Sequence, residues 1–244
     1  MSAQKPLDTT IAMWSGPRNV STAVMYAFAQ RDDMSVIDEP LYGYYLKASG
    51  AQHPGRDVVL DAMAHDANEI IGRLLETNGA HMTFAKMMAH HLAGLDWSFL
   101  QSTRNFLLTR APEEVLPTLS VQLGLPTLED TGYSEQVSLV RAELAAGRDP
   151  LVLDSRQLLT DPESVLRRCC ERLQIPWDER MLCWEPGPKP YDGVWAPFWY
   201  HNVHKSTGFA PYRPKTTPVA DELKPLLDQC RPLYEEISQY AIHA

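Results

Sequence analysis

Residues 11–28 read IAMWSGPRNVSTAVMYAF, and this stretch decides the fold class. It begins with an apolar run, passes through a tight loop at 15–18, and ends with Ser21 and Thr22 at the start of an apolar helical pattern. A buried strand that leads into a helix N-terminus directs backbone N–H groups and the positive end of the helix dipole at one point. Hydroxyl groups and a nearby arginine complete an anion site there, so the stretch predicts a phosphate-binding loop.

The loop lacks the lysine of an ATP-binding loop. That motif reads G-x-x-x-x-G-K-[ST], with a lysine that reaches the outer phosphates and a hydroxyl that holds Mg²⁺. A frame that starts at Gly16 puts Ser21 and Thr22 where the second glycine and the lysine belong. A frame one residue earlier puts Val20 and Ser21 there. The cation of this loop is instead Arg18, which indicates a nucleotide phosphate site without the usual metal–triphosphate chemistry.

Residues 17–22, PRNVST, resemble the P-K-S-G-T-T loop of the sulfotransferases, which bind the 5′-phosphosulfate of 3′-phosphoadenylyl sulfate (PAPS). The resemblance puts Arg18 at the lysine position, where it stabilises charge but cannot lose a proton. It puts Val20 at a glycine position, whose conformational freedom such a turn often uses. It implies PAPS as donor, adenosine 3′,5′-bisphosphate as product, no metal ion, and a donor-binding loop of Ser15, Gly16, Pro17, Arg18, Asn19, Val20, Ser21 and Thr22.

A second segment resembles the family's 3′-phosphate site. Residues 105–110, NFLLTR, read as a buried strand that ends in a cation, and 111–114, APEE, begin a helix with the proline and acids that a first turn favours. The family places an arginine at the end of such a strand and a hydroxyl eight positions later. Here these are Arg110 and Thr118, with Ser120 as a nearby substitute. An arginine fork binds phosphate oxygens in pairs, and the hydroxyl donates a further bond.

The C-terminal part holds a third match. Residues 151–154, LVLD, and 158–166, LLTDPESVL, resemble the family's strand, Asp-Leu-x-x-Pro turn and following helix. A long loop at 187–214 follows, and a loop of this length in a compact domain is usually functional or disordered.

That loop holds further donor-site candidates. Its KPYDGVW at 189–195 resembles the R-K-G-x-x-G-D-W lid over the 3′-phosphate, which implies that Lys189 and Gly193 bind the donor. From the residues alone, KSTG at 205–208 offers other phosphate donors, so Lys205 joins the candidates. The loop's aromatic residues either pack into the core or stack on adenine and wall the acceptor pocket.

Composition limits the partners. A chain of 244 residues that is 44% hydrophobic suits one domain, 1–244, with a substantial core. Its net charge of −9 argues against nucleic acid and acidic membranes as partners, so an anionic donor requires a local cluster of cations. The N-terminal MSAQKPLDTT lacks signal-peptide character, and no apolar run approaches a membrane span, which predicts a cytoplasmic protein. The four cysteines match neither a metal motif nor a disulfide framework.

Short apolar runs alternate with helical patterns. We expect strands at 10–14, 34–38, 81–86, 105–109 and 150–154, and helices at 21–30, 57–76, 112–123, 134–146, 161–173 and 217–240. This order predicts a three-layer α/β/α fold of the P-loop-like, sulfotransferase type, with a central, mostly parallel sheet. Arg18, Glu39, Lys86 and Arg110 each follow or end an expected strand, so they should converge on one crevice.

Sulfuryl transfer needs a base for the acceptor proton and cations for the developing charge. Glu39 is the first candidate base, because it resembles the glutamate after the second strand of carbohydrate-type bacterial sulfotransferases. Lys86 ends the third strand, where the family often places a lysine near the sulfuryl group. His90 and His91 follow, and members that act on small alcohols and phenols use a histidine in this region. The family spacing falls on Met88, so His90 ranks second as base. The histidines match no strong zinc motif, and no metal site is expected.

The sequence thus predicts a metal-independent sulfotransferase with catalytic Arg18, Glu39, Lys86 and His90, which acts on a small hydroxylated or amino acceptor. One alternative is a P-loop kinase or nucleotide hydrolase, which would need Mg²⁺ and normally a lysine in the loop. Another is a non-catalytic domain that binds a nucleotide as a sensor. The identity of the acceptor and the oligomeric state stay open.

Overall fold

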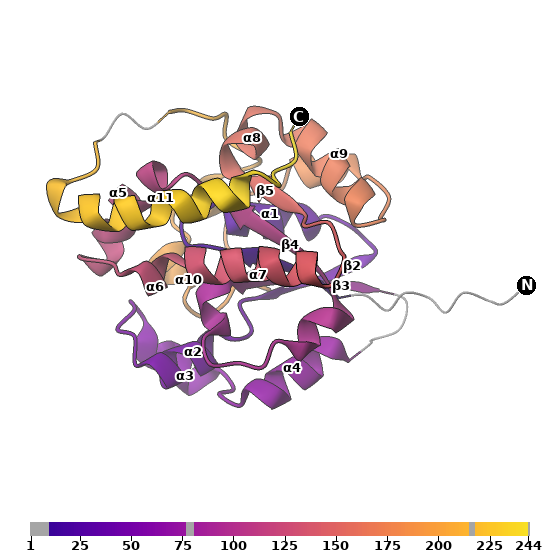
Figure 1. Ribbon diagram of the computed structural model, residues 1–244. Helices are drawn as coiled ribbons and strands as arrows, with labels where there is room; N and C mark the ends of the chain where they lie inside the picture. Colours follow the sequence, from indigo (N-terminus) through magenta and orange to yellow (C-terminus); the bar gives the residue numbers. More distant parts are fainter. Residues whose placement is uncertain (1–9, 77–80, 215–217, 244) are drawn as a thin grey trace, which may run out of the picture.

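The computed structural model describes residues 10–76, 81–214 and 218–243. At its centre lies a five-stranded sheet with the strand order β2-β3-β1-β4-β5, in which each neighbouring pair runs parallel (Figure 1). The strands are β1 (Thr10–Ser15), β2 (Met34–Asp38), β3 (Met82–Met88), β4 (Thr103–Thr109) and β5 (Val152–Asp154). The predicted parallel sheet is confirmed, and each strand overlaps its predicted position.

The register of the sheet aligns the strand ends. All residues of β1 are buried, as expected for an apolar strand in a parallel sheet that is covered on both faces. Ser15, its last residue, pairs with Met88 of β3 and Leu108 of β4, so the three strands reach the same edge. Asp38, the last residue of β2, pairs with Lys86 near that edge. The loops that follow these strands therefore lie side by side, where parallel sheets bind ligands.

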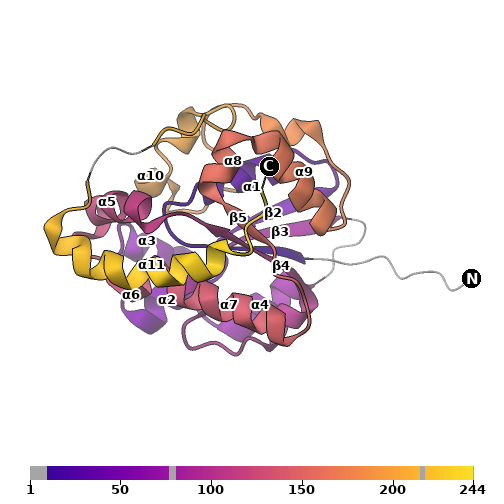
Figure 2. The ribbon, with the colours of Figure 1, turned by 45° about the horizontal axis from the view of Figure 1, so that its top comes forward.

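Helices cover both faces of the sheet (Figures 1 and 2). Ile11 and Met13 of β1 contribute to one apolar core, while Ala12 and Trp14 contribute to another, because successive side chains of a strand point to opposite faces. The first core contains residues of α1 (Ser21–Phe28) and α9 (Pro162–Arg172), and the second those of α4 (Ala67–Leu75), α7 (Tyr133–Ala145) and α11 (Lys224–Ser238). The predicted three-layer α/β/α arrangement is confirmed.

One predicted helix is wrong. The pattern at 57–76 gives two helices, because the backbone is extended at Met63 and Asp66 then caps a new helix by accepting the N–H groups of Asn68 and Glu69. The helices at 42–49, 128–131 and 155–160 were not predicted. The remaining elements are α2 (Tyr42–Ser49), α3 (Arg56–Ala62), α5 (Pro112–Leu123), α6 (Leu128–Thr131), α8 (Ser155–Thr160), α10 (Ala196–Trp199), and the 3-10 turns η1 (Ala89–Leu92), η2 (Ser98–Ser102), η3 (Glu179–Leu182), η4 (Val203–Lys205) and η5 (Asp221–Leu223).

The late segment 187–214 contains only α10 and η4 as regular elements, in line with the long loop that was predicted. It is fastened to the rest of the fold by hydrogen bonds. The Asp192 carboxylate accepts the hydroxyl of Tyr26, and the Tyr212 N–H donates to the Leu159 carbonyl. The predictions for residues 1–9 and for the start of the last helix at Thr217 lie outside the described residues. In the described ranges, no helix has the length and apolar character of a membrane span.

Candidate active site

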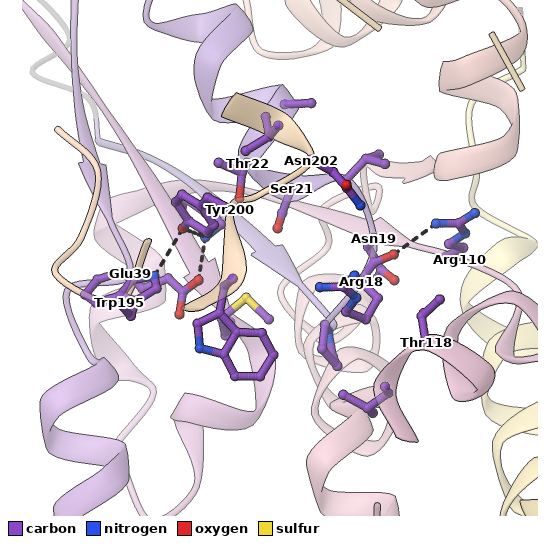
Figure 3. A pocket seen from close by; sticks show the side chains of 18 of the residues that line it. Arg18, Asn19, Ser21, Thr22, Glu39, Arg110, Thr118, Trp195, Tyr200 and Asn202 are labelled. Carbon is purple, nitrogen blue, oxygen red and sulfur yellow. Dashed lines mark hydrogen bonds and ion pairs between the residues drawn. The ribbon is translucent and has the colours of Figure 1, made fainter. Parts of the chain in front are cut away.

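A cavity of about 470 Å³ opens at the carboxyl ends of β1, β2, β3 and β4, with the late segment as its further wall. Figure 3 shows two groups of side chains around it, with Arg18, Arg110 and Thr118 on one side and Glu39, Trp195 and Tyr200 on the other. We call the first group the arginine side and the second, together with Lys86, the carboxylate side. Most predicted site residues line this cavity: Pro17, Arg18, Asn19, Val20, Ser21, Thr22, Glu39, Lys86, His90, Arg110 and Thr118.

The loop between β1 and α1 is held in a strained backbone conformation. Arg18 has φ 61° and Val20 has φ 59°, in the left-handed region that non-glycine residues, above all β-branched ones, rarely adopt. The side chain of buried Asn19 donates to the Leu108 carbonyl at 3.0 Å, and Ser155 donates to the Asn19 carbonyl at 3.0 Å. These bonds fix the loop to the ends of β4 and β5. Strain that the surrounding structure enforces is typical of functional loops.

The N-terminus of α1 is open toward the cavity. Val20 is its N-cap residue and, within the described chain, makes no side-chain cap bond to the first turn. The first N–H groups of a helix have no partner inside the helix and need one from elsewhere. Ser21 and Thr22, which start α1, line the cavity. An anion in the cavity would satisfy these donors.

Ser15 and Gly16 do not line the cavity and support the loop from behind. The buried Ser15 hydroxyl donates to the Gly16 carbonyl at 2.7 Å. A Cβ at Gly16 would lie 2.8 Å from the Thr131 carbonyl oxygen, so only glycine allows this close approach.

The guanidinium of Arg18 is available to a ligand. Its side chain has no hydrogen-bond or ion-pair partner among the described residues and lines the cavity. Burial and, second, the charge of Arg110 lower the pKa of Arg18. Both causes penalise the cationic form, and an anionic ligand would relieve both.

Arg110 is anchored by Glu114 of α5 and by the loop between β1 and α1. Its Nε and Nη2 donate to Glu114 Oε2 at 2.8 and 2.7 Å, and its Nη1 donates to the Arg18 carbonyl at 3.1 Å. A guanidinium has five N–H donors, so two remain for a ligand. Thr118 lies on α5 below it, and its hydroxyl donates to the Val115 carbonyl at 2.8 Å. The structure therefore brings Arg110 and Thr118 to the same wall, as the spacing predicted.

Lys86 is the buried centre of the carboxylate side. Its ammonium group donates to Asp38 Oδ1 at 2.9 Å, to Tyr200 Oη at 2.7 Å and to Glu39 Oε1. These bonds use all three N–H donors of a lysine. Burial alone would lower the pKa of Lys86, but the charges of Asp38 and Glu39 raise it well above its ordinary value. Lys86 is a fixed cation that holds the carboxylates and has no N–H left for a ligand.

Asp38 completes this network without lining the cavity. Its Oδ2 accepts the Tyr200 hydroxyl at 2.7 Å and the Gly193 N–H at 3.0 Å. Trp195 Nε1 donates to the Tyr200 oxygen at 3.2 Å. Asp38 and Tyr200 were not predicted as site residues. Asp38 had a signal, since it ends a strand beside Glu39, whereas Tyr200 had only its place among the loop aromatics.

Glu39 combines a strained backbone with a buried carboxylate that lines the cavity. Its φ is 39°, and its N–H donates to the Lys86 carbonyl at 2.8 Å, which extends the β2–β3 pairing by one residue. Burial, together with the charge of Asp38, raises the pKa of Glu39, while Lys86 acts in the opposite direction. A carboxylate with a raised pKa in a cavity has the character of a general base.

His90 and His91 lie on η1 beside the carboxylate side and line the cavity. Burial lowers the pKa of His90 to about 3, with a smaller effect from His53, and it lowers the pKa of His91 as well. Both imidazoles are therefore neutral near pH 7. His90 Nδ1 and both nitrogens of His91 have no hydrogen-bond partner among the described residues.

Three predicted donor residues do not reach the cavity. Lys189 is half-buried away from the cavity wall, where its Nζ donates to the Glu185 carbonyl at 2.6 Å. At Gly193 an added Cβ would lie 2.1 Å from the Trp195 ring, so this glycine makes room for the tryptophan. Lys205 is exposed on η4 and is absent from the cavity wall.

Over the described ranges, no group of three or more His, Cys, Asp or Glu side chains is arranged to hold a metal ion. The four cysteines are free thiols: Cys169, Cys170, Cys183 and Cys230.

The fold resembles solved sulfotransferase domains. The domain from a Synechococcus olefin synthase is 18% identical and superposes with a TM-score of 0.55, and the match covers 94% of this chain and 98% of that one. A sulfotransferase from Alicyclobacillus acidocaldarius is 10% identical with a TM-score of 0.51, and its match covers 99% and 98% of the two chains. At these identities the likeness concerns the fold alone.

Two Arabidopsis thaliana proteins are similar in sequence. They are named branched-chain-amino-acid aminotransferase-like proteins 2 and 1, and are 38% and 37% identical over 237 and 238 residues. The matches cover 96% of this chain but 42% of each relative, so the chain spans less than half the length of these relatives. The model of the sulfotransferase domain matches residues 9–241. The chain therefore belongs to the sulfotransferase domain family.

Proposed function

We propose that the protein transfers a sulfuryl group from PAPS to the hydroxyl or amino group of a small acceptor, without a metal ion. The observation that carries the proposal is a single cavity that joins the arginine side, suited to an anionic donor, to the buried carboxylate of Glu39. A cytoplasmic location, one domain over 1–244, and the absence of nucleic-acid or membrane partners are sequence-based expectations that belong to the same proposal.

The residues of the arginine side fit the donor. The open N-terminus of α1 and the hydroxyls of Ser21 and Thr22 would hold the phosphosulfate, and Arg18 would balance its charge. The free N–H groups of Arg110 would hold the 3′-phosphate, and the Thr118 hydroxyl would join them by turning from the Val115 carbonyl to the phosphate. Bound PAPS supplies an activated sulfuryl group with a phosphate oxygen as leaving group. Arg18 stabilises charge on that side without giving up a proton.

On the carboxylate side, Glu39 would accept the proton of the acceptor. Lys86 holds Oε1 of this carboxylate, which fixes its orientation toward the cavity. Because Lys86 has no free N–H, its contribution is to position Glu39 and to supply a fixed positive field, rather than to bind the sulfuryl group directly. His90 is the second candidate base, with a neutral ring and an unpartnered Nδ1.

The two alternative functions would require other properties of the arginine side. A P-loop kinase or hydrolase would need Mg²⁺, and the loop contains no lysine for the outer phosphates. A nucleotide sensor would bind without turnover. The names of the curated relatives describe proteins of which this chain spans 42%, and do not decide between these reactions.

The test is calorimetric titration of the purified protein with adenosine 3′,5′-bisphosphate, AMP and ATP with Mg²⁺. We expect micromolar binding of the bisphosphate and much weaker binding of AMP. Arg110→Ala should remove this preference, whereas Arg231→Ala should keep it, because Arg231 is an exposed arginine that pairs with Glu113 outside the cavity.

Turnover of PAPS with an acceptor then separates an enzyme from a sensor. A preference for ATP with Mg²⁺, or the absence of nucleotide binding, would overturn the proposed function.

A further inference from the structure

Aromatic rings form the wall of the cavity beyond Glu39. Tyr42, Trp195 and Trp199 line it together with His53. Tyr42 packs edge-on against Trp195 at 5.2 Å between ring centroids, and His53 lies 6.0 Å from Trp199. Faces of tyrosine and tryptophan attract cations through their ring quadrupoles.

No free cation lies on this part of the wall in the described chain. Lys86 is bound to Asp38 and Glu39, and two carboxylates against one ammonium leave an excess of negative charge when both acids are ionised. The nearby imidazoles are neutral, because burial lowers the pKa values of His90, His91 and His53. An anionic acceptor would therefore meet repulsion here.

Asp130 adds a second acid to this wall. Its Oδ2 accepts the N–H and the hydroxyl of Thr127 in a capping box, and its Oδ1 has no hydrogen-bond partner among the described residues. Its charge acts on the aromatic wall, since burial lowers the pKa of His53 there and the charge of Asp130 opposes this by raising it. Two acids therefore lie on the cavity wall, Glu39 and Asp130.

Several imidazole nitrogens beside the cavity have no hydrogen-bond partner in the described chain, and a ligand could supply one. His53 Nε2, His90 Nδ1 and both nitrogens of His91 are buried without partners in the described ranges. A neutral imidazole has one donor and one acceptor. A hydroxyl group satisfies either, whereas a carboxylate satisfies only the donor.

We infer that the acceptor is a small hydroxylated ammonium compound, an amino alcohol in the chemical sense, with its cation against Glu39, Asp130 and the aromatic wall and its hydroxyl next to Glu39. This inference rests on the proposed function. In the transfer, the acceptor oxygen forms a bond to sulfur, and the bond from sulfur to the bridging oxygen of PAPS breaks. The electron pair stays on the leaving phosphate, and the acceptor proton goes to Glu39.

The experiment compares acceptors that differ in charge, with one pair that keeps the same shape. Release of adenosine 3′,5′-bisphosphate from PAPS is measured with choline, with its uncharged carbon analogue 3,3-dimethyl-1-butanol, with ethanolamine, with glycolate and with a neutral phenol. We expect kcat/KM for the cationic alcohols to exceed that of the neutral analogue roughly tenfold or more, since an ion close to a carboxylate and an aromatic face gains this much. Glycolate should be inactive.

A substitution at Asp130 tests where the ammonium group of the acceptor binds. Asp130→Asn should raise KM for choline roughly tenfold and leave KM for the neutral analogue unchanged, since only the charge is removed. Asp66→Asn is the matched control, because Asp66 also caps a helix but lies outside the cavity.

Equal use of neutral and cationic alcohols, or a preference for the phenol, would overturn the inference while the turnover upholds the proposed function. Bisphosphate binding without transfer to any cationic alcohol also overturns it, and the absence of bisphosphate binding removes the proposed function as well.

Discussion

The arginine side and the carboxylate side are built from the same structural element and behave in opposite ways. Each takes charged residues from the ends of two neighbouring parallel strands, Arg18 and Arg110 after β1 and β4, and Glu39 and Lys86 at β2 and β3. The arginines carry like charges, and Arg18 has no partner in the described chain. Glu39 and Lys86 form an ion pair of opposite charges, and Lys86 is only 1% exposed.

This difference assigns anion binding to the arginine side and proton transfer to the carboxylate side. Like charges in a cavity are costly until an anion arrives, so the arginine side favours an anionic ligand. A buried ion pair is costly to break, so the ion pair with Lys86 keeps the carboxylate of Glu39 in one place. Changes on the two sides should therefore move different measurements.

The largest expected effect comes from Glu39→Gln. The amide keeps the shape of the side chain but cannot accept the acceptor proton, so turnover of PAPS should fall by about 10²- to 10⁴-fold. Binding of adenosine 3′,5′-bisphosphate should stay within about twofold, because the arginine side is intact. Calorimetry and initial rates on the same sample test both. Retained turnover in this variant, with loss in His90→Gln instead, would make His90 the base.

Lys86→Met tests the buried network itself. It leaves the carboxylates of Asp38 and Glu39 close together without a cation, and breaking a buried pair in this way costs about 3–5 kcal/mol of unfolding free energy. Urea denaturation measures the loss. Adding Asp38→Asn should restore part of it, since only one buried charge then remains. A loss below about 1 kcal/mol would show that the network is hydrated and weak.

Arg18→Ala should show the opposite behaviour, with weaker ligand binding and unchanged folding. Hydrogen bonds to charged groups contribute about 1.5–3 kcal/mol, so the bisphosphate should bind about 10- to 150-fold more weakly. Stability should not fall, because the guanidinium has no protein partner in the described chain and repels Arg110. A large loss of stability would mean that the arginine is structural.

The sequence predicted the fold and the strand-end charges because both follow from local patterns. Apolar runs mark buried parallel strands. Glu39 and Arg110 directly follow a strand, Arg18 lies in the loop after β1, and Lys86 lies near the end of β3, so the register of the sheet brings them together. The helix at 57–76 was misplaced because Asp66 caps a second helix within one continuous pattern.

The late segment was harder to predict. Its position depends on long-range contacts such as those between Tyr200 and the pair Asp38 and Lys86, which have no signature in local spacing. The predicted donor residues Lys189 and Lys205 therefore lie away from the cavity, while the unpredicted Tyr200 lies on its wall. Side chains on strand ends are positioned by the sheet, and those on a long loop only by what the loop contacts.

The weakest predicted change concerns the pH dependence of stability at His90, a neutral residue beside the carboxylate side. The folded pKa of His90 is about 3, lowered by burial from 6.5. Below about pH 6.5 the unfolded chain binds a proton that the folded protein does not, so the contribution of His90 to stability is complete above this pH and is lost as the pH falls toward its folded pKa. The slope is about 1.4 kcal/mol per pH unit for each such group.

Urea denaturation at about pH 7 and about pH 5 measures this loss of unfolding free energy. The loss should be smaller for His90→Gln than for the wild type, and unchanged for His201→Gln at an exposed site. Equal slopes for all three proteins would mean that His90 takes up its proton without unfolding, so that its folded pKa is not lowered.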